Sequence, residues 1–261
     1  MSQRAHRGIR LFLLLALVMV VSAACKKTPN PDTEASRYYE AAVVAYNSGD
    51  YELAIQGFSQ AIALSPAQSQ LAYIHRGNAY EQLGATDRAM QDFDQAIAVA
   101  PDSEYAYYAY QSRAMAYFKQ ALWEEAIADY SKTIELKPDA IVAYLMRADS
   151  YRLSGQLDRA LPDADQALAL DTSMAMGYAV RGNIHADRGE WAKAAEDYNQ
   201  ALSILAPSVA RLTFAQAESA QIGNLPQVIA ELEAYSTETT SSQTQITDLL
   251  ERLRAYHAPT P

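Results

Sequence analysis

Residues 73–101, YIHRGNAYEQLGATDRAMQDFDQAIAVAP, decide the fold of this chain. Two apolar segments are separated by Gly84 and closed by Pro101. Glycine supplies the left-handed conformation that ends a helix, and proline cannot donate the N–H that would continue one. Gly77 and Ala89 are small residues, as required where two helices touch most closely. The stretch therefore predicts a helix, a tight turn and a second helix.

The same pattern recurs along the chain at a nearly constant spacing. The small or apolar residue that follows each turn recurs after 35, 37, 34, 34 and 34 residues. These residues are Ala54, Ala89, Ala126, Ala160, Ala194 and Val228. A period near 34 with two helices in each unit is the tetratricopeptide repeat signature. The chain therefore resembles the tetratricopeptide repeat (TPR) family.

The resemblance implies an all-α fold, namely a right-handed superhelical α-solenoid of helix-turn-helix TPR units with a C-terminal capping helix. We expect five TPR units over residues 35–208 and a degenerate sixth TPR-like unit over residues 209–240. The amphipathic segment within residues 241–261 is expected to cover the last apolar face. Pro162 lies well inside the second helix of the fourth unit, where proline should cost up to ~3 kcal/mol or bend the helix.

The N-terminal segment is expected to direct the chain to a membrane. Three arginines precede the apolar run of residues 11–21, which is too short to span a bilayer comfortably and is typical of a secretory signal. Residues 21–25, VSAAC, resemble a bacterial lipobox and contain Cys25, the only cysteine. This implies a signal peptide over residues 1–24, acyl chains on Cys25 and a flexible tether over residues 25–34. An ordinary signal peptide cut nearby, leaving a free thiol, is the alternative.

In enteric lipoproteins, the residue after the acylated cysteine determines whether the protein is retained in the inner membrane. Lys26 stands there, and the aspartate that marks inner-membrane retention is absent. The resemblance therefore implies a bacterial cell-envelope protein, anchored in the outer membrane and facing the periplasm if the cell has two membranes.

The net negative charge of the chain argues against one class of partner, nucleic acids. The sequence contains 21 Lys and Arg against 31 Asp and Glu, and removal of residues 1–24 leaves a net charge of −13. Neutralising phosphates requires clustered Lys and Arg, so this composition argues against nucleic-acid binding.

Arginine and aspartate recur in register in units two to five. The arginines occupy one first-helix position and the aspartates one second-helix position, and unit one lacks both, having Ala41 and Gly57. Pairing within each unit accounts for this pattern, whereas pairing between neighbours would leave the first arginine and the last aspartate alone. We expect four structural ion pairs: Arg76–Asp92, Arg113–Asp129, Arg147–Asp163 and Arg181–Asp197.

The residue types that catalysis needs are sparse. His75 and His185 lie in units two and five, and His257 lies in the tail, none with a second His or Cys at metal-ligand spacing. The sequence has no Gly-rich phosphate loop and no G-x-S-x-G motif. We therefore expect no enzymatic activity, no cofactor and no metal.

Binding is the remaining class of function. In the TPR family the first helices line a concave groove, and the family register places mostly apolar or aromatic residues there. Some members grip a C-terminal carboxylate with paired Lys and Asn, but the Lys is missing here. The expected groove residues are Tyr39, Val43, Tyr46, Leu71, Ile74, Asn78, Tyr108, Met115, Phe118, Val142, Leu145, Met176 and Asn183.

These features predict a membrane-anchored, non-enzymatic scaffold or adaptor that binds an apolar or amphipathic segment of another envelope protein. Large exposed apolar patches are unusual on soluble monomers, so something should cover the groove. The chain's own tether, its C-terminal helix or a second copy in a homodimer are alternative covers. A glycan- or small-ligand-binding module and a self-assembling structural lipoprotein are the alternative functions.

Overall fold

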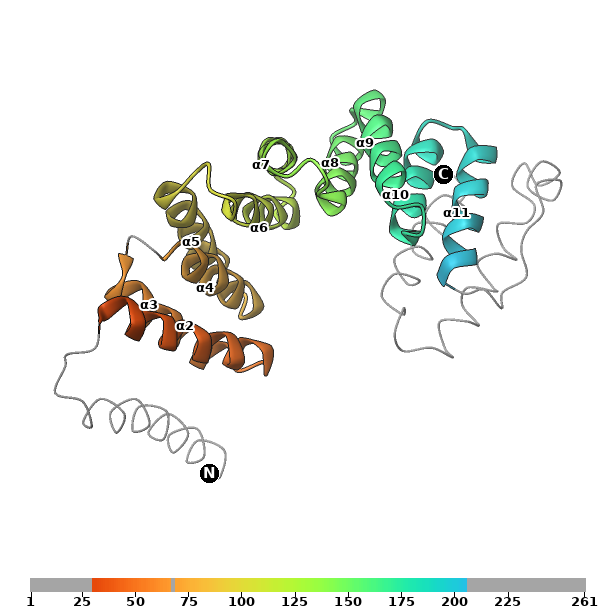
Figure 1. The fold of residues 1–261 in the computed structure, drawn as a ribbon. Coiled ribbons are helices and arrows are strands. Elements are labelled where there is room, and N and C mark those ends of the chain that lie inside the picture. Colours follow the sequence, from red (N-terminus) through yellow and green to blue (C-terminus); the bar gives the residue numbers. More distant parts are fainter. Residues whose placement is uncertain (1–29, 67–68, 206–261) are drawn as a thin grey trace. The chain divides into compact units, whose positions relative to one another are not determined.

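The structure is a computed structural model that describes residues 30–66 and 69–205. Cys25, the expected sixth unit and the expected capping helix lie outside these residues. The regular elements in the described range are helices, with no strand among them (Figure 1). They are α2 (Pro31–Asn47), α3 (Tyr51–Leu64), α4 (Gln70–Gln82), α5 (Thr86–Val99), α6 (Ala106–Lys119), α7 (Trp123–Leu136), α8 (Ile141–Leu153), α9 (Leu157–Leu170), α10 (Ala175–Asp187) and α11 (Trp191–Leu205).

These helices belong to two compact parts, each described by itself. The N-terminal part comprises the described residues up to Ala116, and the C-terminal part comprises those from Tyr117 to Leu205. The boundary falls inside α6. Within the described range, no helix combines the length and the apolar character needed to cross a bilayer.

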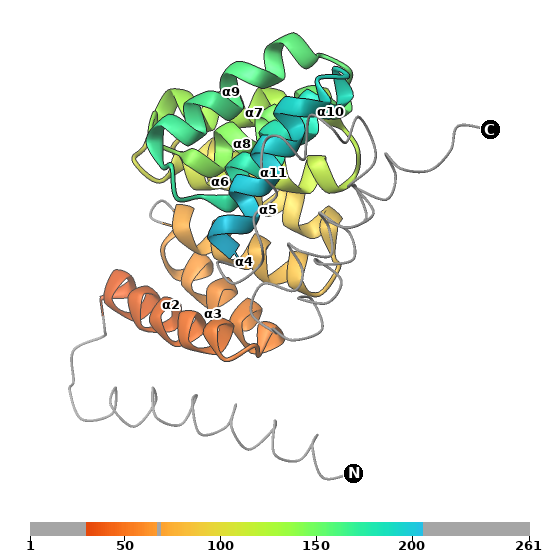
Figure 2. The ribbon, with the colours of Figure 1, turned by 90° about the vertical axis from the view of Figure 1, so that its right-hand side faces the viewer.

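Consecutive helices pack in pairs in both parts. In the N-terminal part α2 packs on α3 and α4 on α5, and the views of Figures 1 and 2 agree that α2 and α3 lie side by side. In the C-terminal part α8 packs on α9 and α10 on α11, while α8 also contacts α10. The predicted all-α fold of helix-turn-helix units is confirmed.

The turns inside the units share one backbone conformation. Gly49, Gly84, Gly155 and Gly189 have φ between +71° and +79°. Ala121 occupies the same turn in unit three with φ +57°. The next residue donates its N–H to a carbonyl five residues back, as from Ala85 to Tyr80. This left-handed residue ends each first helix and lets the second begin at once.

The tether prediction is wrong for its last residues, because α2 begins at Pro31 rather than after residue 34. Asn30 precedes the helix and its side chain accepts a hydrogen bond from the N–H of Asp32. Pro31 is at the first helical position, where its missing N–H leaves no bond unmade, and Asp32 and Glu34 favour the positive end of the helix dipole. The proline that suggested an extended segment instead starts the helix.

Close packing explains the small residues of the repeat. A Cβ atom added to Gly77 would lie 2.5 Å from Cε1 of Phe93, and one added to Gly182 would lie 2.7 Å from Cε1 of Tyr198. In units two and five, the aromatic ring of the second helix therefore lies directly on the backbone of the first helix. In unit four, α9 continues through Pro162 as a single helix.

Candidate functional site

The recurrent arginines bind the aspartates of their own units in three units. Arg147 donates from Nε and Nη2 to the two carboxylate oxygens of Asp163, both at 2.7 Å. Arg76 binds Asp92 in the same way at 2.8 and 2.7 Å. Arg181 binds Asp197 at 2.9 and 2.6 Å, and this bond raises the pKa of its guanidinium. Two parallel charge-assisted bonds fix the relative position of two helices. Arg113 and Asp129 lie in different parts of the molecule, and their pairing stays a prediction.

Each arginine also binds the unit before its own, which the sequence pattern did not predict. Nη1 of Arg76 donates to Ser59 Oγ at 2.9 Å, and Nη1 of Arg147 donates to Ser131 Oγ at 2.9 Å. In the other two units the acceptor at this second-helix position is a carboxylate: Arg113 reaches Asp94 at 2.6 Å and Arg181 reaches Asp165 at 2.9 Å. The arginine therefore joins two units as well as two helices. This role leaves no free cation for an acidic ligand at Arg76, Arg147 or Arg181.

The structure separates the expected groove residues by exposure. Tyr108 is 45% exposed, and Met115, Val142 and Met176 are each 37% exposed. Six others are partly exposed: Tyr39, Val43, Tyr46, Leu71, Asn78 and Phe118.

Ile74, Leu145 and Asn183 are buried, so the groove prediction is wrong for them. Ile74 packs against Ala96 and Ala109 of the neighbouring helices. Leu145 belongs to a cluster with Ala164 and Ile184. Asn183 accepts a 2.9 Å hydrogen bond from the hydroxyl of Tyr198 inside the unit. These first-helix positions are filled by the next helix rather than left for a partner.

One row of first-helix positions remains accessible at the beginning of the helices. Leu71 and Tyr108 hold this position on α4 and α6 of the N-terminal part, and Val142 and Met176 hold it on α8 and α10 of the C-terminal part. Because α8 contacts α10, two apolar side chains in equivalent positions lie on neighbouring helices. Tyr107 and Tyr108 stack on each other with ring centroids 3.9 Å apart, so each has one face already covered. We call Leu71, Tyr108, Val142 and Met176 the entrance row.

A hollow of about 270 Å³ lies beside this row in the N-terminal part. It is lined by α2, the end of α3 and the start of α4: Asp32, Ala35, Ser36, Tyr39, Glu40, Ala61, Ser65, Ser69, Leu71 and Ala72. Burial raises the pKa of the Tyr39 phenol, and nearby Tyr105 adds to the effect. The register prediction found Tyr39 and Leu71 but missed the hollow, because Ser65 and Ser69 lie between the helices on which the register is defined.

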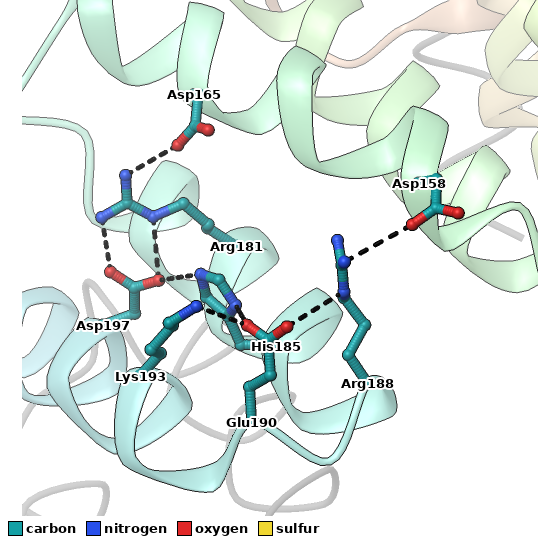
Figure 3. A network of polar contacts seen from close by, with 8 residues as sticks. All are labelled: Asp158, Asp165, Arg181, His185, Arg188, Glu190, Lys193 and Asp197. Carbon is teal, nitrogen blue, oxygen red and sulfur yellow. Dashed lines mark hydrogen bonds and ion pairs between the residues drawn. The ribbon is translucent and has the colours of Figure 1, made fainter.

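A polar network surrounds His185 in unit five (Figure 3). His185 is buried at the position that Tyr80 and Tyr151 fill in other units, and its Nδ1 lies 2.8 Å from Oε2 of Glu190. Lys193 donates to the same carboxylate at 2.9 Å, and these two contacts lower the pKa of Glu190. In unit four the corresponding contact is Arg159 stacked on Tyr151, with the guanidinium 4.3 Å from the ring centroid. The network therefore replaces an aromatic contact that holds the two helices of a unit together.

The described residues contain no group of three or more His, Cys, Asp or Glu side chains placed to hold a metal ion. Arg152 lies in the last turn of α8, and its charge is matched by Asp149 at 2.7 Å and Asp187 at 2.9 Å.

Sequence profiles of the tetratricopeptide repeat match residues 35–68, 71–103, 112–170 and 145–210. The chain belongs to the tetratricopeptide repeat family. The first two matched segments coincide with α2–α3 and α4–α5, and the other two together extend from within α6 to the end of α11, so the TPR units correspond to α2–α3 through α10–α11. No curated protein matches the chain.

Solved TPR structures share the fold at low sequence identity. The structure of MamA from residue 41 to the end, from Desulfovibrio magneticus RS-1, is 18% identical with a TM-score of 0.61, covering 68% of this chain and 98% of that solved chain. YrrB, described as a TPR protein with an unusual peptide-binding site, is 19% identical with a TM-score of 0.56, covering 71% of this chain and 90% of YrrB. A thermophilic TPR protein of Thermus thermophilus is 22% identical with a TM-score of 0.52, covering 67% of this chain and 92% of that protein. These similarities concern the fold alone.

Proposed function

We propose that this TPR protein is a non-enzymatic, lipid-anchored scaffold of the bacterial cell envelope that holds an apolar or amphipathic segment of another envelope protein. TPR folds are interaction modules, and the fold-related YrrB is described as having a peptide-binding site. The observation that carries the proposal is the C-terminal half of the entrance row, where Val142 and Met176 stay exposed at one repeated position on the contacting helices α8 and α10. An isolated exposed apolar residue needs no explanation, whereas two in equivalent positions on neighbouring helices support a contact surface.

The proposed contact is mainly hydrophobic. Val142 and Met176 lie on neighbouring helices, and methionine adapts to partners of different shape because its side chain is unbranched. The buried positions Leu145 and Asn183 hold the helices and take no part in the contact.

Photo-crosslinking in the native membrane tests the contact surface. A photoreactive phenylalanine analogue at Val142 or Met176 should give a discrete crosslinked partner that mass spectrometry identifies. Leu170 is the matched control, because it is 39% exposed but lies on the second helix α9. Equal crosslinking from Leu170, or none from the entrance row, contradicts the proposed surface.

A loss-of-function variant complements the crosslinking. Val142→Asp combined with Met176→Asp should release the partner in a pull-down while Leu170→Asp retains it, with helicity checked by circular dichroism. Crosslinks to a second copy of this chain alone would instead favour self-assembly.

The anchor is tested separately from the groove. Cys25→Ser should abolish incorporation of radiolabelled palmitate and move the protein from the membrane fraction to the soluble fraction, since stable anchoring needs two acyl signals. Label that survives Cys25→Ser contradicts acylation at this residue. Proteinase accessibility from the periplasm tests the orientation, and separation of inner and outer membranes by density tests the outer-membrane location.

A further inference from the structure

The hollow between α2, α3 and α4 is a second feature of the N-terminal part, with a polarity different from that of the entrance row. Its buried lining residues are Ala35, Ala61 and Ala72 together with the polar Ser65 and Ser69, and Leu71 of the entrance row also lines it. Its volume of about 270 Å³ is below the roughly 300–1,000 Å³ of sites for drug-sized ligands. The hollow therefore fits one long side chain better than a whole small molecule.

The three serine hydroxyl groups in the hollow already donate hydrogen bonds within the protein. Ser65 donates to Oδ1 of Asp32 at 2.8 Å, and Ser36 donates to the backbone oxygen of Asp32 at 2.9 Å. Ser69 donates to the backbone oxygen of Pro66. These three hydroxyls can therefore only accept further bonds. Tyr39, whose hydroxyl lies 3.4 Å from Nδ1 of His75, is the other hydroxyl in the lining.

Two carboxylates add to the acceptors. Oδ2 of Asp32 and both oxygens of Glu40 have no donor among the described residues. Among the described residues, no Lys or Arg lines the hollow. The N-terminal part as a whole has four Arg and no Lys against eleven Asp and Glu in its described residues, a net charge of −7. The hollow thus combines the apolar side chains of three alanines and Leu71 with an excess of acceptors and negative charge.

We propose that this hollow receives a lysine or arginine side chain of the partner segment that the entrance row binds. The aliphatic stem would lie on Leu71 and Ala72, and the ammonium or guanidinium would donate to Glu40, Asp32 and the serine oxygens. Ammonium offers three donors and guanidinium five with no acceptor, which complements a site of acceptors. The inference rests on the proposed function, and it defines the partner segment as apolar, with a basic residue close to the residue that contacts Leu71.

A display selection with random peptides tests this inference without a known partner. The full-length chain is immobilised in mild detergent, and selections run in parallel on the wild type and on Glu40→Lys. The wild type should enrich peptides with Lys or Arg at a constant spacing from apolar residues, and Glu40→Lys should enrich Asp or Glu at that position.

The affinity of one enriched basic peptide for the wild type and for two variants tests the role of Glu40 directly. Glu40→Gln should weaken binding by about tenfold, the effect of losing one hydrogen bond to a charged group. Glu52→Gln is the matched control: Glu52 is also exposed in the N-terminal part, on α3, but outside the hollow. Equal weakening by both variants would mean unspecific attraction to an acidic surface and would overturn the inference.

The remaining outcomes separate the inference from the proposed function. Enriched peptides without a basic residue would overturn the inference and leave the scaffold function standing, whereas no enriched peptides at all would contradict both. If Lys26→Gln with Lys27→Gln tightens binding of the basic peptide severalfold, the chain's own lysines occupy the hollow and the partner assignment is wrong. Binding that depends on the chain's concentration through dimer formation would identify a second copy as the occupant.

Discussion

Arg147 and Asp163 are joined by two parallel hydrogen bonds of 2.7 Å, and both side chains are largely withdrawn from solvent. The guanidinium also lies 5.8 Å from the ring centroid of Tyr144, and Nη1 binds Ser131 in the preceding unit. One side chain thus connects three helices in the C-terminal part. An isolated surface ion pair would contribute little, but a charge left without its partner in such a place is costly.

Replacement of Arg147 should therefore destabilise the C-terminal part. We expect Arg147→Ala to lower the free energy of unfolding by about 3 kcal/mol, because Asp163 keeps its charge in a buried place. Ser131→Ala removes the bond between units together with the 2.6 Å bond that Ser131 donates to the backbone oxygen of Ile127, and it leaves the Arg147–Asp163 pair intact, so it should cost about 1 kcal/mol. Urea unfolding followed by circular dichroism measures both. Equal effects of the two variants would contradict the assignment of the larger role to the carboxylate.

Replacement of Ala121 by glycine should stabilise the protein. Ala121 has φ +57°, a conformation that costs an L-residue roughly 1–2 kcal/mol, and glycine holds this turn in the other described units. We expect Ala121→Gly to raise the free energy of unfolding by about 1 kcal/mol after the larger entropy loss of glycine is included. Ala128→Gly, at an exposed position inside α7, should lower it by about 1 kcal/mol. Destabilisation by both variants would show that the turn does not strain Ala121.

Tyr130 carries a buried hydroxyl that has no hydrogen-bond partner among the described residues. Tyr130→Phe should therefore keep or increase stability, by up to about 1–3 kcal/mol, since a buried unsatisfied group is removed without a cavity. Tyr198→Phe is the matched variant in unit five: it leaves Oδ1 of Asn183 buried without the Tyr198 donor and should destabilise. Thermal unfolding compares the two. A loss of stability in Tyr130→Phe as large as in Tyr198→Phe would mean that the Tyr130 hydroxyl has a partner in solution.

Tyr130 should also make the stability of the protein depend on pH in the alkaline range. Burial, with the charges of Asp149 and Asp129, raises the pKa of Tyr130 far above the ordinary 10.0. The folded state keeps the proton that the unfolded state loses, so this contribution is fully present below pH 10 and is lost as pH rises above it. Urea midpoints between pH 9 and pH 11 should fall more steeply for the wild type than for Tyr130→Phe. Parallel pH profiles would contradict the raised pKa.

The sequence was sufficient for the helix pairs, their turns and the within-unit arginine–aspartate contacts, because each of these depends on a residue that recurs at a fixed distance. Arg76 and Asp92 are 16 positions apart, as are Arg147 and Asp163 and Arg181 and Asp197. The bond to the preceding unit escaped this reasoning because its acceptor alternates between serine and aspartate. A pattern of charge alone does not include Ser59 and Ser131.

The sequence could not divide the groove residues by exposure. Leu71 and Ile74 are both apolar and three positions apart on α4, but only Ile74 is buried by its neighbours, Ala96 and Ala109. Burial of a first-helix residue depends on the next helix, which the family register does not specify. The start of α2 was misjudged for a related reason: a proline suits both an extended tether and a first helical turn, and the bond between Asn30 and Asp32 favours the helix.

The bridging arginine also constrains how such an array can lengthen. In unit one, Ala41 and Gly57 replace the arginine and aspartate, and a Cβ at Gly57 would lie 2.8 Å from Cβ of Ala42. A duplicated copy of α4–α5 inserted beside its parent would bring its own arginine and an acceptor for the next one. A copy fused in front of α2 would be followed by unit one, which has Ala41 in place of the bridging arginine. Unit one also has no room for an aspartate at position 57. Growth by internal duplication is therefore open to this protein, whereas addition before α2 requires redesign of that helix pair first.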